Sequence, residues 1–173
     1  MMNYTHIQTH SEFKKFNEIM FDGSIYSKKE LYTEENHLKD FISIDLRKAN
    51  FSIINYYCPN IFGGKSWEEF LMDFGASSYI AKSKYIRQVI FGACNPKKQI
   101  QAQTALMSGL AQFLESAGYH IYSVVTDEII LDVNPGDQIS CGSIINLIKQ
   151  NFPKIAYMFK IESFNLSKND LGY

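Results

Sequence analysis

The chain has 173 residues, of which 46% are hydrophobic and 20% are charged, and its formal net charge is −1. This composition is typical of one globular domain with a hydrophobic core. The net charge excludes a surface that is positive overall, so any nucleic-acid binding requires a local basic patch. No apolar run approaches the roughly 20 residues of a membrane span, and the first ten residues lack the features of a signal peptide. We therefore expect a cytoplasmic, intracellular protein with no membrane partner.

The first 40 residues are polar and mixed, and we interpret them as an N-terminal extension to a single domain over residues 41–173. Residues 41–44, Phe-Ile-Ser-Ile, are typical of a buried strand, and Asp45 follows them directly. Residues 46–57 mix charged, β-branched and aromatic side chains, which indicates a turn that leads into a short helix.

A helical insertion is predicted over residues 65–117. Ser66, followed three residues later by Glu69, has the pattern of a capping box and opens the first helix of the insertion. A second helix is expected to begin at Ser77 or Ser78.

The third helix of the insertion has the clearest boundaries, because Asn95 can cap its start and Gly118 lies just past its end. The same region has no acidic residue between positions 73 and 115. A solvated helix face is the ordinary interpretation of cations on a helix, but the missing acids favour contact with phosphate groups. This basic patch consists of Lys82, Lys84, Arg87, Lys97 and Lys98.

Residues 119–133 are too long for one ordinary strand, and a hairpin with its tip near Thr126 and Asp127 divides them into two. A short helix is expected over 143–150 and a final strand over 155–164. From residue 41 onward the order is strand, helices, strand, strand, helix, strand. This order predicts an α+β, ferredoxin-like (βαββαβ) fold, with an antiparallel sheet and helices packed on one face.

Asp45 and Asp127 each lie in one of the two most apolar, strand-like segments of the chain. A carboxylate beside a buried strand is costly unless it is paired or holds a metal ion. In a ferredoxin-like sheet the end of the first strand and the central hairpin are adjacent, so the two aspartates would be neighbours in space. We therefore expect a site that binds Mg²⁺ or Mn²⁺ for phosphoryl transfer. The alternative is that both aspartates only cap turns at strand ends.

The cysteines and histidines predict no site of their own. The cysteines are far apart and odd in number, so they match neither a zinc-ligand spacing nor a disulfide framework. The four histidines form no metal-ligand pattern either. We expect three reduced thiols, at Cys58, Cys94 and Cys141.

Three segments of the chain match, in the same order, three sequence motifs that occur together in other proteins. Residues 45–54, Asp-Leu-Arg-Lys-Ala-Asn-Phe-Ser-Ile-Ile, match the pattern D-F-x-S-L-Y-P-S-I-I in length and at both ends. Residues 84–92 keep the lysine, the aromatic residue and the glycine of K-x-x-x-N-S-x-Y-G, and residues 123–128 keep the Thr-Asp pair of Y-x-D-T-D-S. In this order the segments resemble the palm of template-dependent DNA polymerases of the family B type, including the protein-primed branch.

The resemblance implies a template-dependent nucleotidyltransferase, in which the 3′-hydroxyl of a primer attacks a nucleoside triphosphate. It also implies that Asp45 and Asp127 are the catalytic, metal-binding aspartates. Glu128 offers a further catalytic carboxylate, as in the Asp-Glu pair of family A polymerases. Magnesium accepts backbone oxygens, so the carbonyl of Leu46 is a further candidate metal ligand.

The same resemblance assigns the partners, which are primer-template nucleic acid and a nucleoside triphosphate. Lys84 would bind the phosphates of the incoming nucleotide, and Arg87 on the same helix face would assist. Asn50 takes the position of a tyrosine that contacts the sugar, and Phe91 is a candidate for stacking on a base. The candidates for binding the nucleic acid itself are Lys82, Lys97 and Lys98.

The chain also departs from the family. Val125 replaces the first aspartate of the third motif, and Gln88 and Val89 replace the Asn-Ser pair of the second. There is no room for an exonuclease before residue 41 or for a full thumb after residue 133. The expected protein is a palm with a short fingers-like insertion, one part of a split or reduced polymerase of viral, phage or plasmid origin.

Two other functions compete with an active polymerase. The first is a palm-derived, catalytically inactive subunit that binds nucleic acid or assembles with a second protein subunit. The second is an RNA-binding module with stacking aromatic residues on its sheet, although the aromatic-rich strand motif of such modules is missing. Retention of Asp45, Lys84 and Asp127 together favours the active enzyme.

Overall fold

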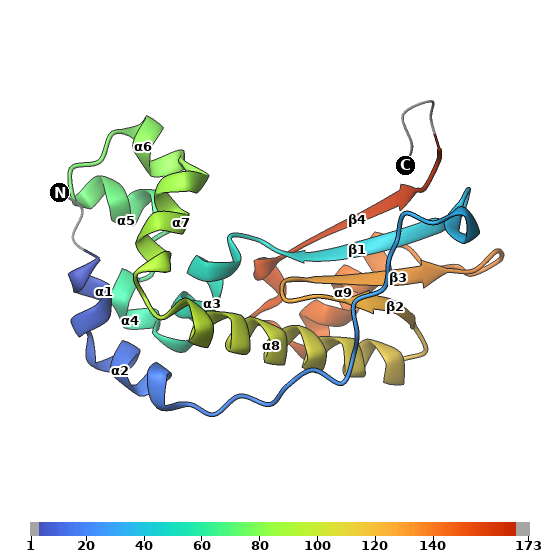
Figure 1. The fold of residues 1–173 in the computed structure, drawn as a ribbon, viewed down its shortest axis with the longest axis horizontal. Helices are drawn as coiled ribbons and strands as arrows, with labels where there is room; N and C mark the ends of the chain where they lie inside the picture. Colours follow the sequence, from blue (N-terminus) through green and yellow to red (C-terminus); the bar gives the residue numbers. More distant parts are fainter. Residues whose placement is uncertain (1–3, 169–173) are drawn as a thin grey trace. The chain divides into compact units, whose positions relative to one another are not determined.

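The computed structural model describes residues 4–168, which form two compact units (Figure 1). Unit 1 consists of residues 4–22 and 48–103, and unit 2 consists of residues 23–47 and 104–168. The boundary falls within the longest helix, α8 (Pro96–Ser116). Each unit therefore contains part of the expected N-terminal extension.

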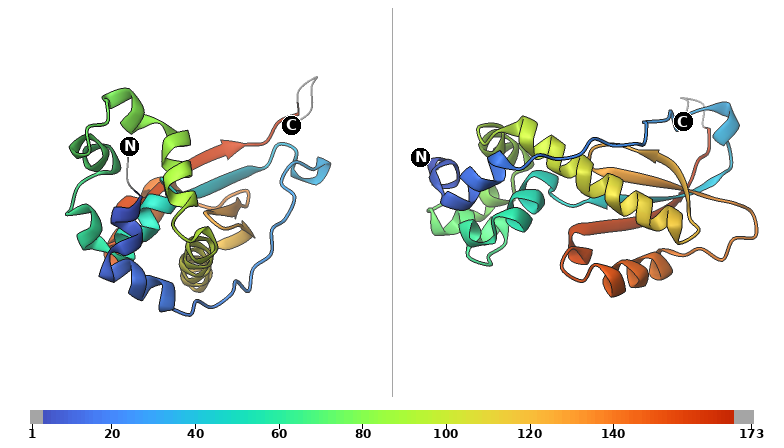
Figure 2. Two further views of the ribbon diagram at one scale, coloured as in Figure 1. Left: turned by 60° about the vertical axis from the view of Figure 1, so that its left-hand side comes forward. Right: turned by 90° about the horizontal axis from the view of Figure 1, so that it is seen from below.

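Unit 2 is a mixed α+β structure built on a four-stranded antiparallel sheet (Figures 1 and 2). The central strand β1 pairs antiparallel with β3 on one side and β4 on the other, and β2 pairs antiparallel with β3. The strand order is β2-β3-β1-β4, so β2 and β4 form the edges. The predicted hairpin and the α+β class are confirmed. The strands are β1 (Asp40–Leu46), β2 (His120–Val124), β3 (Glu128–Val133) and β4 (Phe159–Asn165).

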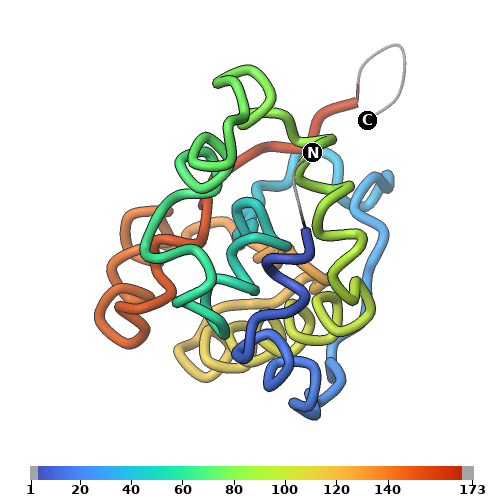
Figure 3. The backbone as a smooth tube through the Cα atoms, turned by 90° about the vertical axis from the view of Figure 1, so that its left-hand side faces the viewer, coloured from blue at the N-terminus to red at the C-terminus, as the bar shows by residue number. Residues whose placement is uncertain are grey.

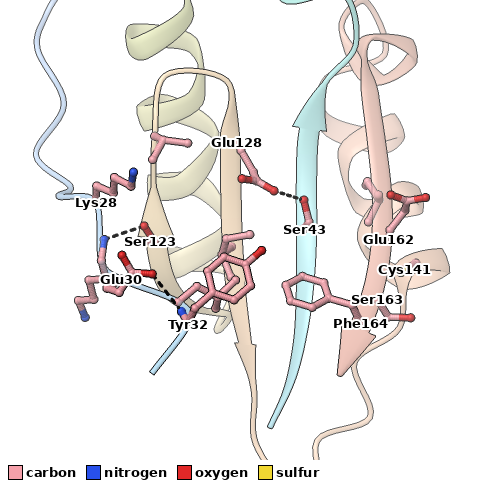
Figure 4. Close-up of a pocket in the computed structure, with 15 residues that line it drawn as sticks. Lys28, Glu30, Tyr32, Ser43, Ser123, Glu128, Cys141, Glu162, Ser163 and Phe164 are labelled. Atoms are coloured by element: carbon pink, nitrogen blue, oxygen red, sulfur yellow. Dashed lines mark hydrogen bonds between the residues drawn. The ribbon is translucent and has the colours of Figure 1, made fainter. Parts of the chain in front are cut away.

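The two faces of this sheet have different surroundings. Side chains alternate along a strand, so Ile42 and Ile44 of β1 point to one face, while Ser43 and Asp45 point to the other. Figure 4 shows α8 and α9 (Cys141–Asn151) behind the sheet and the side chain of Ser43 in front of it. The side with Ile42 and Ile44 is therefore covered by helices. We call the side with Ser43 and Asp45 the open face.

The helix-covered face holds the core of unit 2. Along α8 the buried residues recur at intervals of three or four, so they form one stripe on the helix. Full burial of such side chains contributes about 1.5–3 kcal/mol each for the larger ones. The residues of α8 and α9 that are at most 3% exposed include Met107, Leu110, Ala111, Leu114, Ile144 and Ile148.

An extended segment of unit 2, residues 24–33, lies beside β2, and we call it the strap. The backbone amide of Lys29 donates a 2.9 Å hydrogen bond to the hydroxyl of Ser123. The hydroxyl of Tyr122 donates to the carbonyl oxygen of Glu30 at 2.6 Å, and the hydroxyl of Tyr26 donates to Glu115 at 2.8 Å. The first two bonds hold the strap against the sheet edge, and the third holds it against α8. Two short 3₁₀ helices, η1 (Glu34–Asn36) and η2 (Ala156–Met158), precede β1 and β4.

Unit 1 contains short helices and the start of α8. Aromatic rings pack around Trp67, which is fully buried; the ring centroids of Trp67 and Phe91 are 5.0 Å apart, and those of Trp67 and Phe70 are 6.0 Å apart. The predicted capping box is confirmed, since Ser66 and Glu69 bond to each other's backbone amides. The helices are α1 (Thr5–Thr9), α2 (Ser11–Glu18), α3 (Ala49–Tyr57), α4 (Pro59–Phe62), α5 (Trp67–Asp73), α6 (Ser78–Lys82) and α7 (Lys84–Gly92).

The second helix of the predicted insertion is broken into α6 and α7, so the expectation of one continuous helix is wrong. Ser83 adopts extended backbone angles, φ −68° and ψ 118°, and its hydroxyl accepts a 3.3 Å hydrogen bond from the amide of Ile86. A serine side chain competes for backbone bonds and favours a cap over a helix interior. The chain therefore ends α6 and starts α7 at this residue. Figure 3 traces the backbone through both helices.

The boundaries of α8 match the sequence. Asn95 has a φ of 51°, and its side chain accepts a 3.3 Å hydrogen bond from the amide of Lys98. Gly118 follows the helix with a φ of 96°, a conformation that favours glycine. The apolar pattern along this helix in the sequence also predicts that Ile100 points inward; this prediction is wrong, because the side chain is 51% exposed.

All three cysteines are free thiols, as expected. Cys58 and Cys94 are buried, and burial raises the pKa of their thiols to about 12 and about 11. Cys141 is half-buried at the start of α9. Separately, none of the helices within residues 4–168 is long and apolar enough to cross a membrane.

Candidate functional site

Unit 2 brings the two aspartate-bearing segments to one end of its sheet. Asp45, near the end of β1, lies directly opposite Glu128, the first residue of β3. The backbone amide of Leu46 donates a 2.8 Å hydrogen bond to the carbonyl oxygen of Asp127, which lies in the β2–β3 turn. In Figure 4 the tip of β1 and this turn lie at the same end of the sheet. The backbone therefore places Asp45 beside the Asp127-Glu128 pair.

The negative charge at this end is only partly compensated. Burial raises the pKa of the Asp45 carboxyl, and the charges of Asp127 and Glu128 raise it further. Lys160, opposite Asp45 on β4, lowers that pKa, but its ammonium also forms a 2.8 Å ion pair with Glu162. Because the net direction is upward, ionised carboxylates are held together here at a cost that a bound cation would relieve.

Glu128 has a second interaction that fixes its carboxylate. The hydroxyl of Ser43 donates a 2.6 Å hydrogen bond to Oε1 of Glu128, drawn as a dashed line in Figure 4. Ser43 lies two positions before Asp45 on β1, so both residues are on the open face. The Glu128 carboxylate is thus held toward Ser43, which leaves Asp45 and Asp127 as the main candidate metal ligands.

These two residues can supply two carboxylate oxygens to a cation. Within residues 4–168, no group of three or more His, Cys, Asp or Glu side chains is arranged to hold a metal ion. Mg²⁺, however, is commonly bound by one or two carboxylates together with substrate phosphates. The residues present therefore fit a magnesium ion that a substrate helps to hold, and they do not fit an all-protein metal cage.

The open face carries a groove of about 1030 Å³ that reaches Glu128 (Figure 4). The strap forms one wall, with Lys28 among its residues, and β4 contributes Glu162 to the other. Ser43 and Ile130 of the two central strands lie between them. The groove therefore combines acidic, basic and apolar lining; it reaches Glu128, whereas Asp45 and Asp127 are not among its lining residues. Its size is at the upper end of the range of small-molecule sites.

In unit 1, two of the predicted nucleotide-binding residues contact each other. The Nε atom of Arg87 donates a 3.3 Å hydrogen bond to the side-chain oxygen of Asn50. Glu68 lies near Arg87 and forms a 2.5 Å ion pair with Lys48. Burial alone would raise the pKa of Glu68, but the hydrogen bond from Lys48 and the charge of Arg87 make the net direction downward. Arg87 is therefore positioned by a small polar network.

The other predicted cations of unit 1 differ in their surroundings. Lys82 ends α6 and Lys84 begins α7, and both are exposed, as is Lys97. Lys98 is half-buried; its ammonium donates a 2.8 Å hydrogen bond to the carbonyl oxygen of Ile19. Lys98 thus has a structural contact within unit 1, while the three exposed lysines remain candidates for binding phosphate.

Phe91 is a correction to the predicted site. Its side chain is 1% exposed and packs against Trp67 and Phe62. A ring that is buried among other aromatic side chains has no face available for a base. The structure gives Phe91 a packing role in place of the expected stacking role.

Sequence reasoning missed three features of these sites. Ser43 could have been found, because alternation along β1 places it on the same face as Asp45. Lys48 could not have been found, because it pairs with Glu68 from a left-handed backbone conformation, with a φ of 45°, that nothing in its sequence context predicts. The strap was also missed, because its hydrogen bonds to β2 join residues about 90 positions apart.

Comparison with models of known protein families gives no match, and comparison with curated protein sequences gives none either.

Proposed function

We propose that this protein is a template-dependent nucleotidyltransferase with a polymerase palm-like unit, in which unit 2 carries the catalytic carboxylates. The observation that carries the proposal is the meeting of Asp45 and Asp127 at one end of the sheet, where the amide of Leu46 bonds to the carbonyl oxygen of Asp127. Burial, together with the charges of Asp127 and Glu128, raises the pKa of Asp45 there. Two neighbouring carboxylates whose negative charge is not fully balanced by basic side chains are suited to phosphoryl transfer with a divalent metal.

The arrangement of the strands supports a ferredoxin-like palm. β1 and β2 are each antiparallel to β3, which lies between them, so they run parallel to each other and are split by the third strand. The helical insertion connects β1 to β2, and α9 connects β3 to β4. This order agrees with a split βαβ and so supports the proposed βαββαβ arrangement.

In the proposed reaction, the open face positions the primer 3′-hydroxyl beside Asp45 and Asp127. These carboxylates, with the carbonyl oxygen of Leu46 as a further candidate, would hold Mg²⁺ or Mn²⁺. Such an ion, when bound, lowers the pKa of the attacking hydroxyl and stabilises charge on the phosphates. Ser43 donates a hydrogen bond to the Glu128 carboxylate and so fixes its orientation on the open face.

Unit 1 carries the cations to which the proposal assigns phosphate binding. Lys84 is exposed at the first residue of α7, and Arg87 lies three residues later, about one turn along the same helix. Asn50 holds Arg87, so its proposed contact with the sugar would compete with this hydrogen bond. The role of Asn50 in the proposal is therefore to orient Arg87 as well as to approach the sugar.

A second candidate is a catalytically inactive, palm-derived subunit that binds nucleic acid or assembles with another protein. Val125 in place of a carboxylate favours this candidate. In this case the partner subunit would complete the site.

The test is Asp127→Asn, which keeps the side-chain shape but removes a metal-binding charge. If the protein is an enzyme, the variant should lose nucleotide incorporation on a primed template while its circular dichroism spectrum is unchanged. Asp132→Asn is the matched control, because Asp132 lies near the other end of β3, opposite Phe41 and His120. Incorporation should survive in this control.

A thermal melt separates the two candidates further. A metal ion that binds the folded state alone raises the melting temperature by mass action, and Asp127→Asn should remove that increase. Wild-type protein that gives no Mg²⁺ response with nucleotide and primed template present would overturn catalysis by this chain alone. The inactive-subunit candidate would then be preferred.

A further inference from the structure

The segment of unit 1 that runs from α5 to α7 contains many large apolar side chains that are exposed. Six of the 14 exposed large hydrophobic residues among residues 4–168 fall within positions 72–89. Such a concentration marks an interaction surface more often than isolated exposed residues do. The six are Met72, Phe74, Tyr79, Ile80, Tyr85 and Val89.

The most exposed of these are two tyrosines on either side of the α6–α7 break. Tyr79 is 87% exposed in α6, and Tyr85 is 71% exposed in α7. On α7, Tyr85 and Val89 are four residues apart and share a helix face, while Ile90 and Phe91 are buried. The helix therefore presents apolar side chains to solvent as well as to the core, which indicates that a partner covers its outer side.

The charges around these rings indicate what the partner is. Lys82 and Lys84 lie between Tyr79 and Tyr85 in the sequence, and both are exposed. The chain has no acidic residue from position 74 to position 114, so the cations on this surface lack acidic neighbours in sequence. A partner that combines negative charge with flat rings matches both features.

We propose that Tyr79 and Tyr85, with Lys82 between them, bind single-stranded nucleic acid. The tyrosine rings stack on unpaired bases, and the lysine ammonium groups bind the phosphates that link them. Duplex nucleic acid offers the same phosphates but keeps its base faces inside the helix, so the rings gain nothing from it. The surface therefore prefers a single strand to a duplex, and this preference goes beyond the proposed catalytic function.

The experiment measures binding of a fluorescein-labelled oligothymidylate, and of a duplex of the same length, by fluorescence anisotropy. Wild-type protein should bind the single strand more tightly. Tyr79→Ala and Tyr85→Ala should each weaken single-strand binding by roughly 5- to 150-fold and change duplex binding little. Tyr79→Phe and Tyr85→Phe should retain binding, because the ring is kept.

Two controls separate stacking from charge and from folding. Tyr157→Ala removes a ring of unit 2 that is 62% exposed and should leave single-strand binding unchanged. Lys82→Ala should reduce the slope of log affinity against log salt by about 0.7 over about 50–200 mM salt. Because the replaced side chains are exposed, the melting temperatures of all variants should stay close to that of the wild type.

Any of three results would overturn the proposal. These are equal binding of single strand and duplex, no loss of affinity in the tyrosine-to-alanine variants, and a wild-type dimer in sedimentation that these variants convert to a monomer. The last would assign the surface to a second copy of this chain. Asp45→Asn protein should still bind the single strand with wild-type affinity, so failure of catalysis and failure of this surface are distinguishable.

Discussion

Replacing Asp45 with asparagine should stabilise unit 2 when no divalent cation is present. The reason is that burial disfavours the Asp45 charge and that the carboxylates of Asp127, Glu128 and Glu162 repel it, while Lys160 only partly offsets them. An asparagine would keep the shape of the side chain and remove the repulsion. The same substitution should abolish any Mg²⁺-dependent rise in melting temperature and any nucleotide incorporation.

The size of the gain follows from the strand register. Asp45 and Glu128 are directly opposite on antiparallel strands, where Cβ atoms lie about 4.5–5.5 Å apart. For carboxylates about 6 Å apart, Coulomb's law gives a repulsion of about 0.7 kcal/mol in bulk water and about 3 kcal/mol at the effective dielectric constant of a protein surface. Asp45 is half-buried, so solvent screens part of this energy. With three neighbouring carboxylates, those of Asp127, Glu128 and Glu162, opposed by one lysine, we expect a net gain of about 1 kcal/mol.

The gain should depend on pH. The folded-state pKa of Asp45 is raised above its ordinary value of 3.8, so the folded protein binds this proton more tightly than the unfolded chain does. The electrostatic cost in the wild type is therefore absent below about pH 3.8 and complete above the raised pKa. Asp45→Asn should stabilise the protein at about pH 7, and the gain should shrink as the pH falls toward about 4.

Urea unfolding provides the measurement. The sole tryptophan, Trp67, lies in unit 1, so its fluorescence follows that unit, while far-UV circular dichroism follows both. The gain should appear in the circular dichroism transition near neutral pH, and Asp132→Asn should show none. An Asp45→Asn protein that is less stable than the wild type at neutral pH without metal would refute the reasoning, because it would show that Asp45 is favourably paired.

The other expected outcomes concern unit 1. Lys84→Ala should weaken binding of a nucleoside triphosphate, measured by calorimetry, with little change in stability. The control Lys154→Ala should leave this binding unchanged. If binding to the Lys84→Ala variant is unchanged and independent of salt, Lys84 belongs to a solvated helix face. Ser66→Ala should lower the free energy of unfolding by about 1 kcal/mol, because it removes the bond to the Glu69 amide, and an unchanged urea midpoint would contradict this cap. Phe91→Ala should cost about 3–5 kcal/mol in urea unfolding; a loss below about 1 kcal/mol would place the ring outside the core.

The parts of the fold that the sequence predicted are those with local signals. The capping box at Ser66, the start of α8 at Asn95 and the hairpin around Asp127 each depend on a few neighbouring residues. The order of these elements was enough to place Asp45 and Asp127 in adjacent segments, because strand pairing follows from the chain order in this class of fold.

The parts that the sequence did not predict depend on distant contacts. Phe91 lies on an amphipathic helix whose two faces are both partly apolar, so periodicity alone could not show that it points inward. Two hydrogen bonds join residues that are distant in the sequence: Ser43 donates to Glu128, 85 positions away, and Arg87 donates to Asn50, 37 positions away. Such pairs need the folded register before either partner can be assigned.

The unequal burial of the three thiols makes this chain suited to site-specific labelling without any engineered residue. Alkylating reagents react with the thiolate, and the raised pKa of the Cys58 and Cys94 thiols keeps both protonated near neutral pH. Cys141 is half-buried and borders the groove on the open face. A maleimide dye should therefore attach at this position alone, where its emission would report directly on what enters the groove.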